Sequence, residues 1–273
     1  MKSFTWDAND YARHSTIQKS WARELIAKLN LQGNEHLLDI GCGDGKVTAE
    51  LAERLPDGSV LGIDNSASMI ELAQKTFAPR NHPNLSFQLA DARNLTFEHL
   101  FEVVFSNAAL HWAHDHRPIL KGIWRSLRPG GRILLQMGGD GNAAAIIRIL
   151  DKMIAEKNWK QYFNYFEFPY GFHPPDVYII WLEKTGFDAQ RVALIPKLMK
   201  HDGESALAGW IRTTWLPYTE RIPKKHRTKF IQELTHRYIK ENSPDADGRI
   251  HVQMVRLEVE ALKKGGPFIG SGG

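Results

Sequence analysis

A glycine-rich segment directly after an apolar run constrains this chain more than any other stretch. Residues 37–40 predict a buried strand, and glycine then occupies every second position as Gly41, Gly43 and Gly45. A chain that turns at once from a buried strand into a helix needs unusual φ/ψ values, which glycine tolerates. Glycine also lets a ligand approach the backbone closely. The segment therefore predicts a nucleotide-type cofactor site.

The spacing of these glycines separates three known cofactor loops. The dinucleotide pattern G-x-G-x-x-G does not match, because Gly45 comes one place early and Lys46 occupies the third glycine position. The phosphate-binding P-loop does not match either, because Gly41 and Gly45 enclose three residues instead of four and Val47 follows the lysine. The pattern present is D-x-G-x-G-x-G, which begins at Asp39.

Strand and helix patterns alternate regularly from Leu37 to Met137. The predicted strands are 37–40, 59–63, 85–89, 103–105 and 132–137, with a turn expected at 128–131. Such alternation predicts right-handed βαβ units and a parallel sheet covered by helices on both faces. Beyond Gly138 the pattern changes to helices at 143–157, 174–185, 205–214 and 224–239, with strands at 187–195 and 250–261.

Asp64 follows the second predicted strand, about 20 positions beyond the glycines. An acidic residue at this point is placed to accept hydrogen bonds from both hydroxyls of a ribose. Asp64 could instead cap the next helix, although Asn65 and Ser66 could do so equally well. The preceding loop favours the ribose role.

Composition excludes several other classes. The net charge of +4 is small and dispersed, and the basic run 224–229 continues a helical pattern, so nucleic-acid binding is not expected. The only cysteine, Cys42, cannot form an intrachain disulfide, and no run of about 18 apolar residues could span a membrane. These features predict a cytoplasmic protein without a membrane partner. No metal is expected, because the short segment 111–116 can rarely direct three imidazoles and a carboxylate to one point, and His114 and His116 are expected as surface or capping residues.

Several segments together carry a resemblance to a known family. They are the D-x-G-x-G-x-G loop, Asp64, Asp91-Ala92, the segment 106–112 (SNAALHW) and Pro129-Gly130-Gly131. This ordered set resembles the class I S-adenosylmethionine-dependent methyltransferases over about residues 10–137. The segment 106–112 is similar to trans-aconitate 2-methyltransferases, and the His111-Trp112 pair with Gln18 upstream is similar to juvenile hormone acid methyltransferases.

The resemblance implies a fold and a domain organisation. The fold is α/β, a Rossmann-like, doubly wound, seven-stranded and mostly parallel sheet with an antiparallel last strand and a helical cap. The implied parts are an N-terminal helical lid (1–30), a cofactor-binding core (31–141), a helical cap containing one core strand at 187–195 (142–247), the last core strand (248–264) and a flexible tail (265–273).

The resemblance also implies site residues. S-adenosylmethionine would bind at Asp39, Gly41, Gly43, Asp64, Asn65, Asp91, Ala92 and Asn107, with Asp91 and the Ala92 N–H at the adenine. Gln18 and Trp112 would hold the methyl acceptor, and His111 would lie next to it.

Methyl transfer from a sulfonium needs no acid, because the leaving group is already charged. A carboxylate acceptor with a pKa of about 4 needs no base either, whereas a hydroxyl or amine would need one, for which His111 is the candidate. We therefore expect O-methylation of a small carboxylate similar to trans-aconitate. The alternatives are N- or C-methylation with His111 as base, or a non-catalytic cofactor-binding protein. The sequence determines neither the acceptor nor the oligomeric state.

Overall fold

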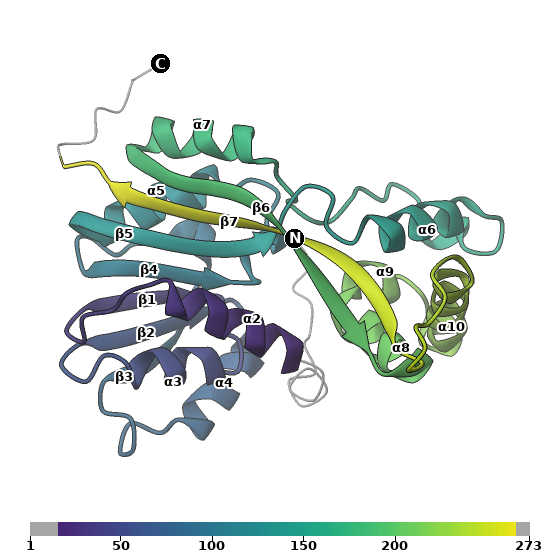
Figure 1. Cartoon of the computed structure of the whole chain (residues 1–273), viewed down its shortest axis with the longest axis horizontal. Helices are drawn as coiled ribbons and strands as arrows, with labels where there is room; N and C mark the ends of the chain where they lie inside the picture. The colour runs from purple at the N-terminus through teal and green to yellow at the C-terminus, as the bar shows by residue number, and fades with distance from the viewer. Residues whose placement is uncertain (1–15, 266–273) are drawn as a thin grey trace. The chain divides into compact units, whose positions relative to one another are not determined.

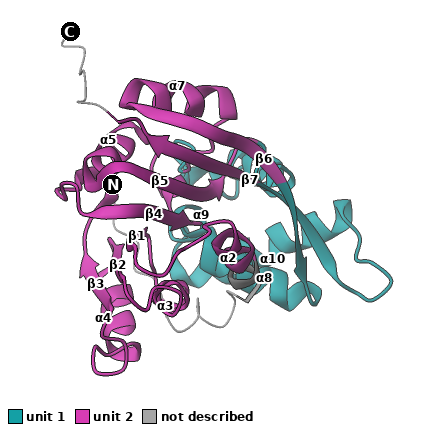
Figure 2. Ribbon diagram, turned by 60° about the vertical axis from the view of Figure 1, so that its left-hand side comes forward, with its two compact units in different colours: residues 1–17, 141–169, 196–255 teal, residues 18–140, 170–195, 256–273 magenta. Residues whose placement is uncertain are grey.

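The computed structural model describes residues 16–265, with side chains from Trp21 onward. These residues fall into two compact units, shown in different colours in Figure 2. Unit 2 contains Gln18–Asp140, Tyr170–Ile195 and the chain from Arg256, and unit 1 contains Gly141–Pro169 and Pro196–Val255. The first half of the expected lid (1–15) and nearly all of the expected tail (266–273) fall outside the described residues, and the expected division of the chain stays a prediction.

Seven strands form one sheet in the order β3-β2-β1-β4-β5-β7-β6 (Figure 1). Their bounds are β1 His36–Ile40, β2 Ser59–Asp64, β3 Leu85–Leu89, β4 Phe101–Asn107, β5 Leu127–Gly138, β6 Phe187–His201 and β7 Ile250–Lys263. The strands β1 to β5 pair in parallel, and β7 runs antiparallel to β5. The predicted fold class is thus confirmed. Strand order reverses between β1 and β4, which is where ligands bind in sheets of this kind.

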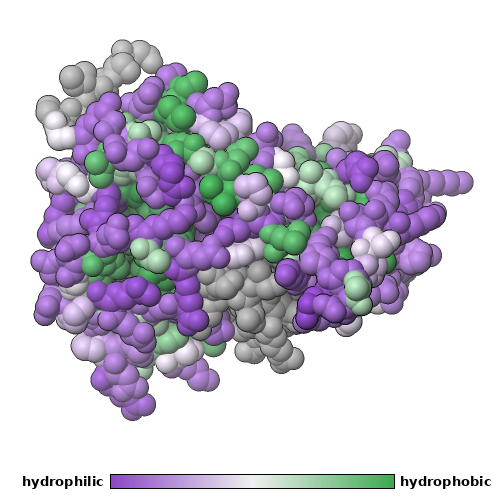
Figure 3. All heavy atoms as spheres, in the orientation of Figure 1, coloured by the Kyte–Doolittle hydropathy of each residue, from purple (hydrophilic) through white to green (hydrophobic). Residues whose placement is uncertain are grey.

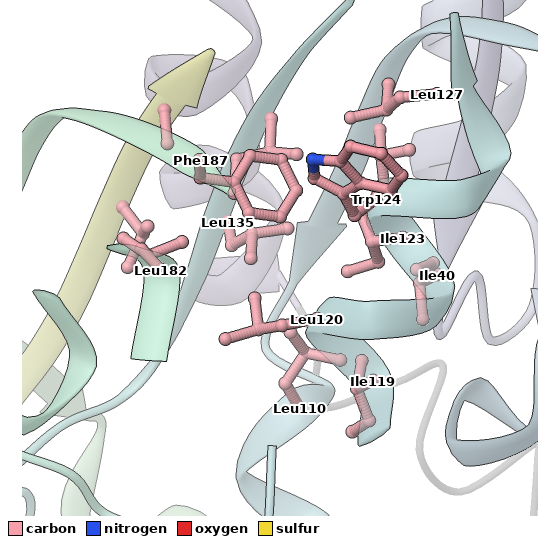
Figure 4. Close-up of a cluster of buried hydrophobic side chains, with 14 of the residues drawn as sticks. Ile40, Leu110, Ile119, Leu120, Ile123, Trp124, Leu127, Leu135, Leu182 and Phe187 are labelled. Atoms are coloured by element: carbon pink, nitrogen blue, oxygen red, sulfur yellow. The ribbon is translucent and has the colours of Figure 1, made fainter. Parts of the chain in front are cut away.

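Helices cover both faces of the sheet in unit 2. They are α2 Thr16–Ala27, α3 Lys46–Ala52, α4 Ala67–Thr76, α5 Arg117–Ser126 and α7 Pro175–Thr185. Apolar residues of α2, α3 and α4 pack with Leu37, Val103 and Leu134 on one face. On the other face α5 and α7 pack against β1, β4 and β5, and Figure 4 shows Trp124, Leu182 and Phe187 within this cluster. Hydrophilic residues dominate the molecular face shown in Figure 3.

Strands β5 and β6 are longer than the sequence predicts. The expected turn at 128–131 is part of β5, where pairing with β4 shifts register between Phe101 and Val103 and Gly130 adopts a φ of 75°. This irregularity bends the strand without ending it, as a β-bulge does. β6 continues past Ile195 to His201 beside β7. Strand pairing of this kind depends on a partner distant in sequence, so local pattern did not reveal it.

Unit 1 consists of helices and the outer parts of β6 and β7. Its helices are α6 Ala144–Ala155, the short η3 Lys160–Tyr162, α8 Gly203–Thr214, α9 Leu216–Thr219 and α10 Lys224–Glu241. Part of the aromatic run 158–170 belongs to its core, because Trp159 and Phe163 are buried against Phe230. Tyr165 of the same run is fully exposed. Arg237 pairs with Glu156 across the helices.

Candidate active site

The glycine loop lies between β1 and α3 and is tied to β2 by its backbone. Gly41, Gly43 and Gly45 have φ values of 78°, 54° and 80°, in the left-handed region that favours glycine. The backbone N–H groups of Gly41 and Cys42 both donate to the carbonyl oxygen of Ile63, at 2.7 and 3.0 Å. The loop therefore has one defined path over the ends of β1 and β2.

The space around Gly41 differs from that around Gly43. A Cβ at Gly41 would lie 2.1 Å from the Cβ of Ala109, so close packing against the segment after β4 requires glycine there. A Cβ at Gly43 would meet no atom within 4 Å. The space above Gly43 is therefore open, and a ligand could approach its backbone.

Asp64 ends β2 and faces the glycine loop. Its Oδ2 accepts a hydrogen bond from the Gly43 N–H at 3.0 Å, and its Oδ1 accepts one from the Ser66 N–H at 2.9 Å. Burial raises the pKa of this carboxyl, although the backbone hydrogen bonds oppose that shift. Asn65, the next residue, is exposed. The structure thus brings Asp64 and Gly43 together.

Asp39 lies inside the fold, beneath the loop. Its buried Oδ2 accepts a hydrogen bond of 2.7 Å from the Thr48 hydroxyl in α3. Burial raises its pKa to about 7, and the nearby Asp64 adds to this shift. This pair joins β1 to α3 across the loop. Thr48 was not predicted from the sequence, because a threonine within a helix gives no signal of its partner.

Asp91 and Ala92 lie after β3, where Asp91 caps the short helix η1 (Ala92–Asn94). The carboxylate accepts from the Arg93 backbone N–H at 2.9 Å and pairs with the Arg93 guanidinium. The hydrogen bond from that guanidinium lowers the pKa of Asp91. The carboxylate remains partly exposed, so it could accept a further hydrogen bond while Arg93 holds it in place.

The end of β4 is joined to both neighbouring strands. The Ser106 hydroxyl donates 2.7 Å to the carbonyl oxygen of Ile40, and the Ala108 N–H donates 2.8 Å to that of Gln136. Asn107 is the last residue of β4 and lies between these two links. The glycine loop and the segment 106–112 therefore meet at the point where the strand order reverses. Ser106 belonged to the recognised segment, but its role emerged only from the structure.

His111 lies in the short helix η2 (Leu110–Trp112) and is buried. The Gly138 N–H donates 3.4 Å to its Nδ1, so that nitrogen acts as an acceptor and the neutral ring carries its proton on Nε2. Burial lowers the pKa of His111 to about 3, and the positive charge of Arg256 contributes. The imidazole is therefore neutral at every ordinary pH.

An aromatic group surrounds His111. The ring centroids of Trp112, Tyr170 and Phe172 lie 5.7, 6.2 and 5.9 Å from its ring. Tyr170 and Phe172 stack in parallel, and Gly171 between them donates its N–H to the His111 carbonyl oxygen at 2.9 Å. The sequence predicted His111 and Trp112 but not Phe172, which is about 60 residues away.

Three further residues were named from the sequence: Gln18, His114 and His116. Gln18 lies in α2, but its side chain is outside the part of the chain that the structure describes. His116, expected as a surface or capping residue, is fully buried and is not on the surface; it occupies the N-cap position of α5, although its side chain makes no capping hydrogen bond. Its ring contacts the Tyr178 hydroxyl at 3.2 Å and the Ala113 carbonyl oxygen at 3.0 Å, which explains why an imidazole is retained inside the fold. His114 is exposed, as expected.

Comparison with known proteins identifies the family. A family model described as a methyltransferase domain matches residues 37–131. Over 266 residues the chain is 31% identical to an uncharacterized methyltransferase of Schizosaccharomyces pombe, covering 95% of this chain and 98% of that protein. The chain belongs to the class I S-adenosylmethionine-dependent methyltransferases. The expected cofactor, S-adenosylmethionine, and the assignment as an enzyme are thereby confirmed.

The methyltransferase also resembles proteins with named activities. It is 31% identical over 234 residues to a trans-aconitate 2-methyltransferase of Deinococcus radiodurans, covering 83% of this chain and 87% of that enzyme. Its fold is similar to that of Haemonchus contortus phosphoethanolamine N-methyltransferase 2 in complex with S-adenosyl-L-methionine. The TM-score is 0.59 at 17% identity, covering 94% of this chain and 56% of that chain, so this likeness concerns the fold alone.

Membrane-spanning helices and clusters of metal-binding side chains are both absent from residues 16–265 of the methyltransferase. None of the helices between residues 16 and 265 is long and apolar enough to cross a membrane. Within the same part of the chain, no group of three or more His, Cys, Asp or Glu side chains could hold a metal ion.

Proposed function

We propose that this methyltransferase converts a carboxylate of a small molecule into its methyl ester, with the acceptor held beside His111 and Trp112. The observation that carries the proposal is the buried, neutral imidazole of His111. A group with a pKa of about 3 is a weak base and could not remove a proton from a hydroxyl or an amine efficiently. A carboxylate arrives ionised at neutral pH and needs no base. The relative named trans-aconitate 2-methyltransferase supports the same class of acceptor.

The cofactor would lie at the carboxyl ends of β1, β2 and β4. The open space above Gly43 suits the approach of its amino-acid portion to the backbone of Gly41 and Gly43. Asp64 can accept hydrogen bonds from ribose hydroxyls as well, since a carboxylate has about four acceptor positions and its two backbone bonds use only part of them. Asp91 and the Ala92 N–H would bind adenine, and Asn65 and Asn107 would line the same edge. Asp39, hydrogen-bonded to Thr48, would support the loop from below.

S-adenosylmethionine supplies a methyl group on a positively charged sulfur, so no acid is needed for the leaving group. The protein then has to position the acceptor oxygen about 3 Å from the methyl carbon and to exclude water. The aromatic group around His111 provides apolar surface for water exclusion. The Nε2–H of His111 can donate a hydrogen bond to a carboxylate oxygen, and Gln18 and Trp112 would hold the acceptor. The proposal includes a cytoplasmic location, because a single cysteine cannot form an intrachain disulfide and suits a reducing compartment.

The chemical stability of the product tests this proposal. The protein is incubated with methyl-labelled S-adenosylmethionine and a panel of small carboxylates that includes trans-aconitate, and the product is then treated with mild alkali. A methyl ester releases labelled methanol, whereas N- and C-methyl groups survive. Alkali-stable label would contradict the proposal and favour N- or C-methylation.

The variant His111→Gln separates hydrogen-bond donation from base catalysis. Glutamine can replace the Nε2–H donor but cannot accept a proton at neutral pH. We expect kcat on the carboxylate acceptor to fall less than about tenfold, because a general base contributes on the order of 10²- to 10⁴-fold. Loss of activity by a factor of 100 or more, with cofactor binding intact, would show that the imidazole acts as a base.

A further inference from the structure

Ala108 has an unusual backbone conformation at the end of β4. Its φ is 57°, in the left-handed region that is unfavourable for an L-residue with a side chain. Among the non-glycine residues with a positive φ in the part of the chain that the structure describes, Ala108 is the one at the cofactor edge of the sheet. Such conformations gather at functional sites, where surrounding contacts hold them in place.

Hydrogen bonds to two further strands hold Ala108 in this conformation. Its N–H donates 2.8 Å to the carbonyl oxygen of Gln136 on β5. Gln136 is buried, and its side-chain amide donates 2.8 Å to Glu258 on β7. Glu258 is also buried and pairs with Lys28 at 2.6 Å. The carbonyl group that binds Ala108 therefore belongs to a firmly held strand.

The left-handed residue sets the course of the chain that follows it. Ala109 lies against the cofactor loop, because its Cβ is 2.1 Å from the position that a Cβ on Gly41 would take. The short helix η2 begins at the next residue and contains His111, whose Nδ1 accepts from the Gly138 N–H. One turn of the backbone at Ala108 thus joins the contact with the cofactor loop to the position of the imidazole.

The cofactor loop has anchors of its own on β2. The N–H groups of Gly41 and Cys42 both donate to the carbonyl oxygen of Ile63. The carboxylate of Asp64 accepts from another N–H of the loop at 3.0 Å. A different backbone conformation at Ala108 should therefore move η2 relative to the loop, while the loop keeps its path and its capacity to bind the cofactor.

We propose that Ala108 is a positioning residue for methyl transfer, because its left-handed backbone sets the place of His111, and of the acceptor beside it, relative to the cofactor loop. This inference rests on the proposed acceptor site at His111. The acceptor atom has to lie about 3 Å from the methyl carbon, and a misplacement of about 1 Å can lower the rate on the order of 100-fold. The reaction therefore requires the backbone conformation of Ala108, and its methyl side chain is secondary.

Three substitutions of Ala108 separate backbone conformation from side-chain size. Glycine and asparagine adopt the left-handed conformation readily, whereas β-branched valine disfavours it strongly. We expect kcat to stay within about threefold of wild type in Ala108→Gly and Ala108→Asn, and to fall about 30-fold or more in Ala108→Val. The rate is measured with methyl-labelled S-adenosylmethionine and the carboxylate of the panel that is methylated fastest. Calorimetry should show that S-adenosylhomocysteine binding changes less than about threefold in all three variants, since the loop keeps its own anchors.

Tyr165→Val is the matched control. Tyr165 also has a left-handed backbone, with a φ of 55°, but its side chain is fully exposed and it belongs to unit 1. Valine meets the same backbone conflict there, and kcat should stay within about threefold of wild type. A loss equal to that in Ala108→Val would trace the effect to valine in any left-handed segment and would overturn the inference.

Hydrogen exchange of the Gly138 amide is a second readout, and it needs no acceptor. This N–H donates to His111 Nδ1, so a displaced η2 removes its partner. In protein labelled with ¹⁵N-glycine and saturated with S-adenosylhomocysteine, NMR should show this amide exchanging about tenfold faster or more in Ala108→Val. The glycine and asparagine variants should exchange as wild type does.

Several results would overturn the inference. An unchanged kcat or an unchanged exchange rate in Ala108→Val would mean that the conformation affects stability alone. A loss of kcat in Ala108→Asn equal to that in Ala108→Val would attribute the effect to side-chain size. A parallel loss of S-adenosylhomocysteine binding would mean that Ala108 only supports the cofactor loop.

If Ala108→Val does not fold, Ala108→Leu decides by the same measurements, because its unbranched Cβ conflicts less with the left-handed backbone. We then expect kcat to fall about fivefold or more. The alkali test reports only which bond is formed, and the exchange measurement needs no acceptor. Failure of the proposed carboxylate methylation can therefore be distinguished from failure of this assignment.

Discussion

Three buried polar residues at the cofactor edge of unit 2 and two in the helical region of unit 1 differ in their hydrogen bonding. At the cofactor edge, Asp39, Asp64 and Ser106 all have hydrogen-bond partners at 2.7 to 3.0 Å. In unit 1, Trp210 Nε1 and Tyr218 Oη are buried with no hydrogen-bond partner among the described residues. Hydrogen bonds therefore hold the three residues of the cofactor edge in place, whereas Trp210 and Tyr218 are held by packing against other aromatic rings. An unpartnered buried polar group costs about 1–3 kcal/mol, so the two regions should respond differently to the same kind of substitution.

The largest effect is expected within the glycine loop, from Gly41→Ala. The added Cβ would overlap that of Ala109 and would also require a left-handed backbone, which together cost about 4 kcal/mol of unfolding free energy. The control Gly43→Ala has a similar φ but open space, and should cost about 1 kcal/mol while weakening cofactor binding. Urea denaturation measures the stabilities. Equal losses in both variants would show that the loop is not held against the segment after β4.

The next effect concerns Asp39 and depends on pH. Its pKa is raised from 3.8 in an unfolded chain to about 7, so the folded state binds more protons than the unfolded state in this interval. The contribution of this group to stability is therefore present below about pH 4 and is lost as pH rises toward 7. Asp39→Asn removes this dependence. The unfolding free energy of the variant, relative to that of wild type, should rise by up to about 1.4 kcal/mol per pH unit across this range. Denaturation at several pH values measures this difference. A pH-independent difference would mean that Asp39 remains charged in the fold.

Asp64→Ala tests whether the hydrogen-bonded carboxylate of unit 2 also serves the cofactor. We expect S-adenosylmethionine binding to weaken by about 2 kcal/mol through the loss of charge-assisted hydrogen bonds. Isothermal titration calorimetry measures the dissociation constant. An unchanged constant in a folded variant would show that Asp64 only holds Gly43 and Ser66 in place.

The smallest effect sharpens the comparison between the units. Tyr218→Phe removes a buried hydroxyl that has no partner among the described residues, and should leave the unfolding free energy within about 0.5 kcal/mol of wild type or raise it. Ser106→Ala removes a hydroxyl that donates to Ile40 and should cost about 1 kcal/mol. Thermal or urea denaturation measures both variants. A larger loss from Tyr218→Phe than from Ser106→Ala would reverse the distinction drawn between the two regions.

Much of the site could be predicted from the sequence because its residues follow strands. The spacing from Asp39 to Gly45 indicated the loop, and Asp64 follows the next strand, so both must meet at one edge of a parallel sheet. The proximity of Arg256 to His111 could not be found in this way. Arg256 lies within a strand whose pattern gives no signal of what packs on either face, and its neighbours Trp21 and Gly138 are more than 100 residues away in sequence.

The sequence by itself determined the α/β class, the cofactor loop and the family, because strand periodicity, glycine conformation and motif spacing are local properties. Only the tertiary structure decided the protonation of His111 and the burial of His116 and Arg256. These properties depend on desolvation and on charges contributed by distant segments, such as β7 beside β5. A histidine in a motif was therefore a candidate base in the sequence, and burial in the fold made it a neutral hydrogen-bonding group.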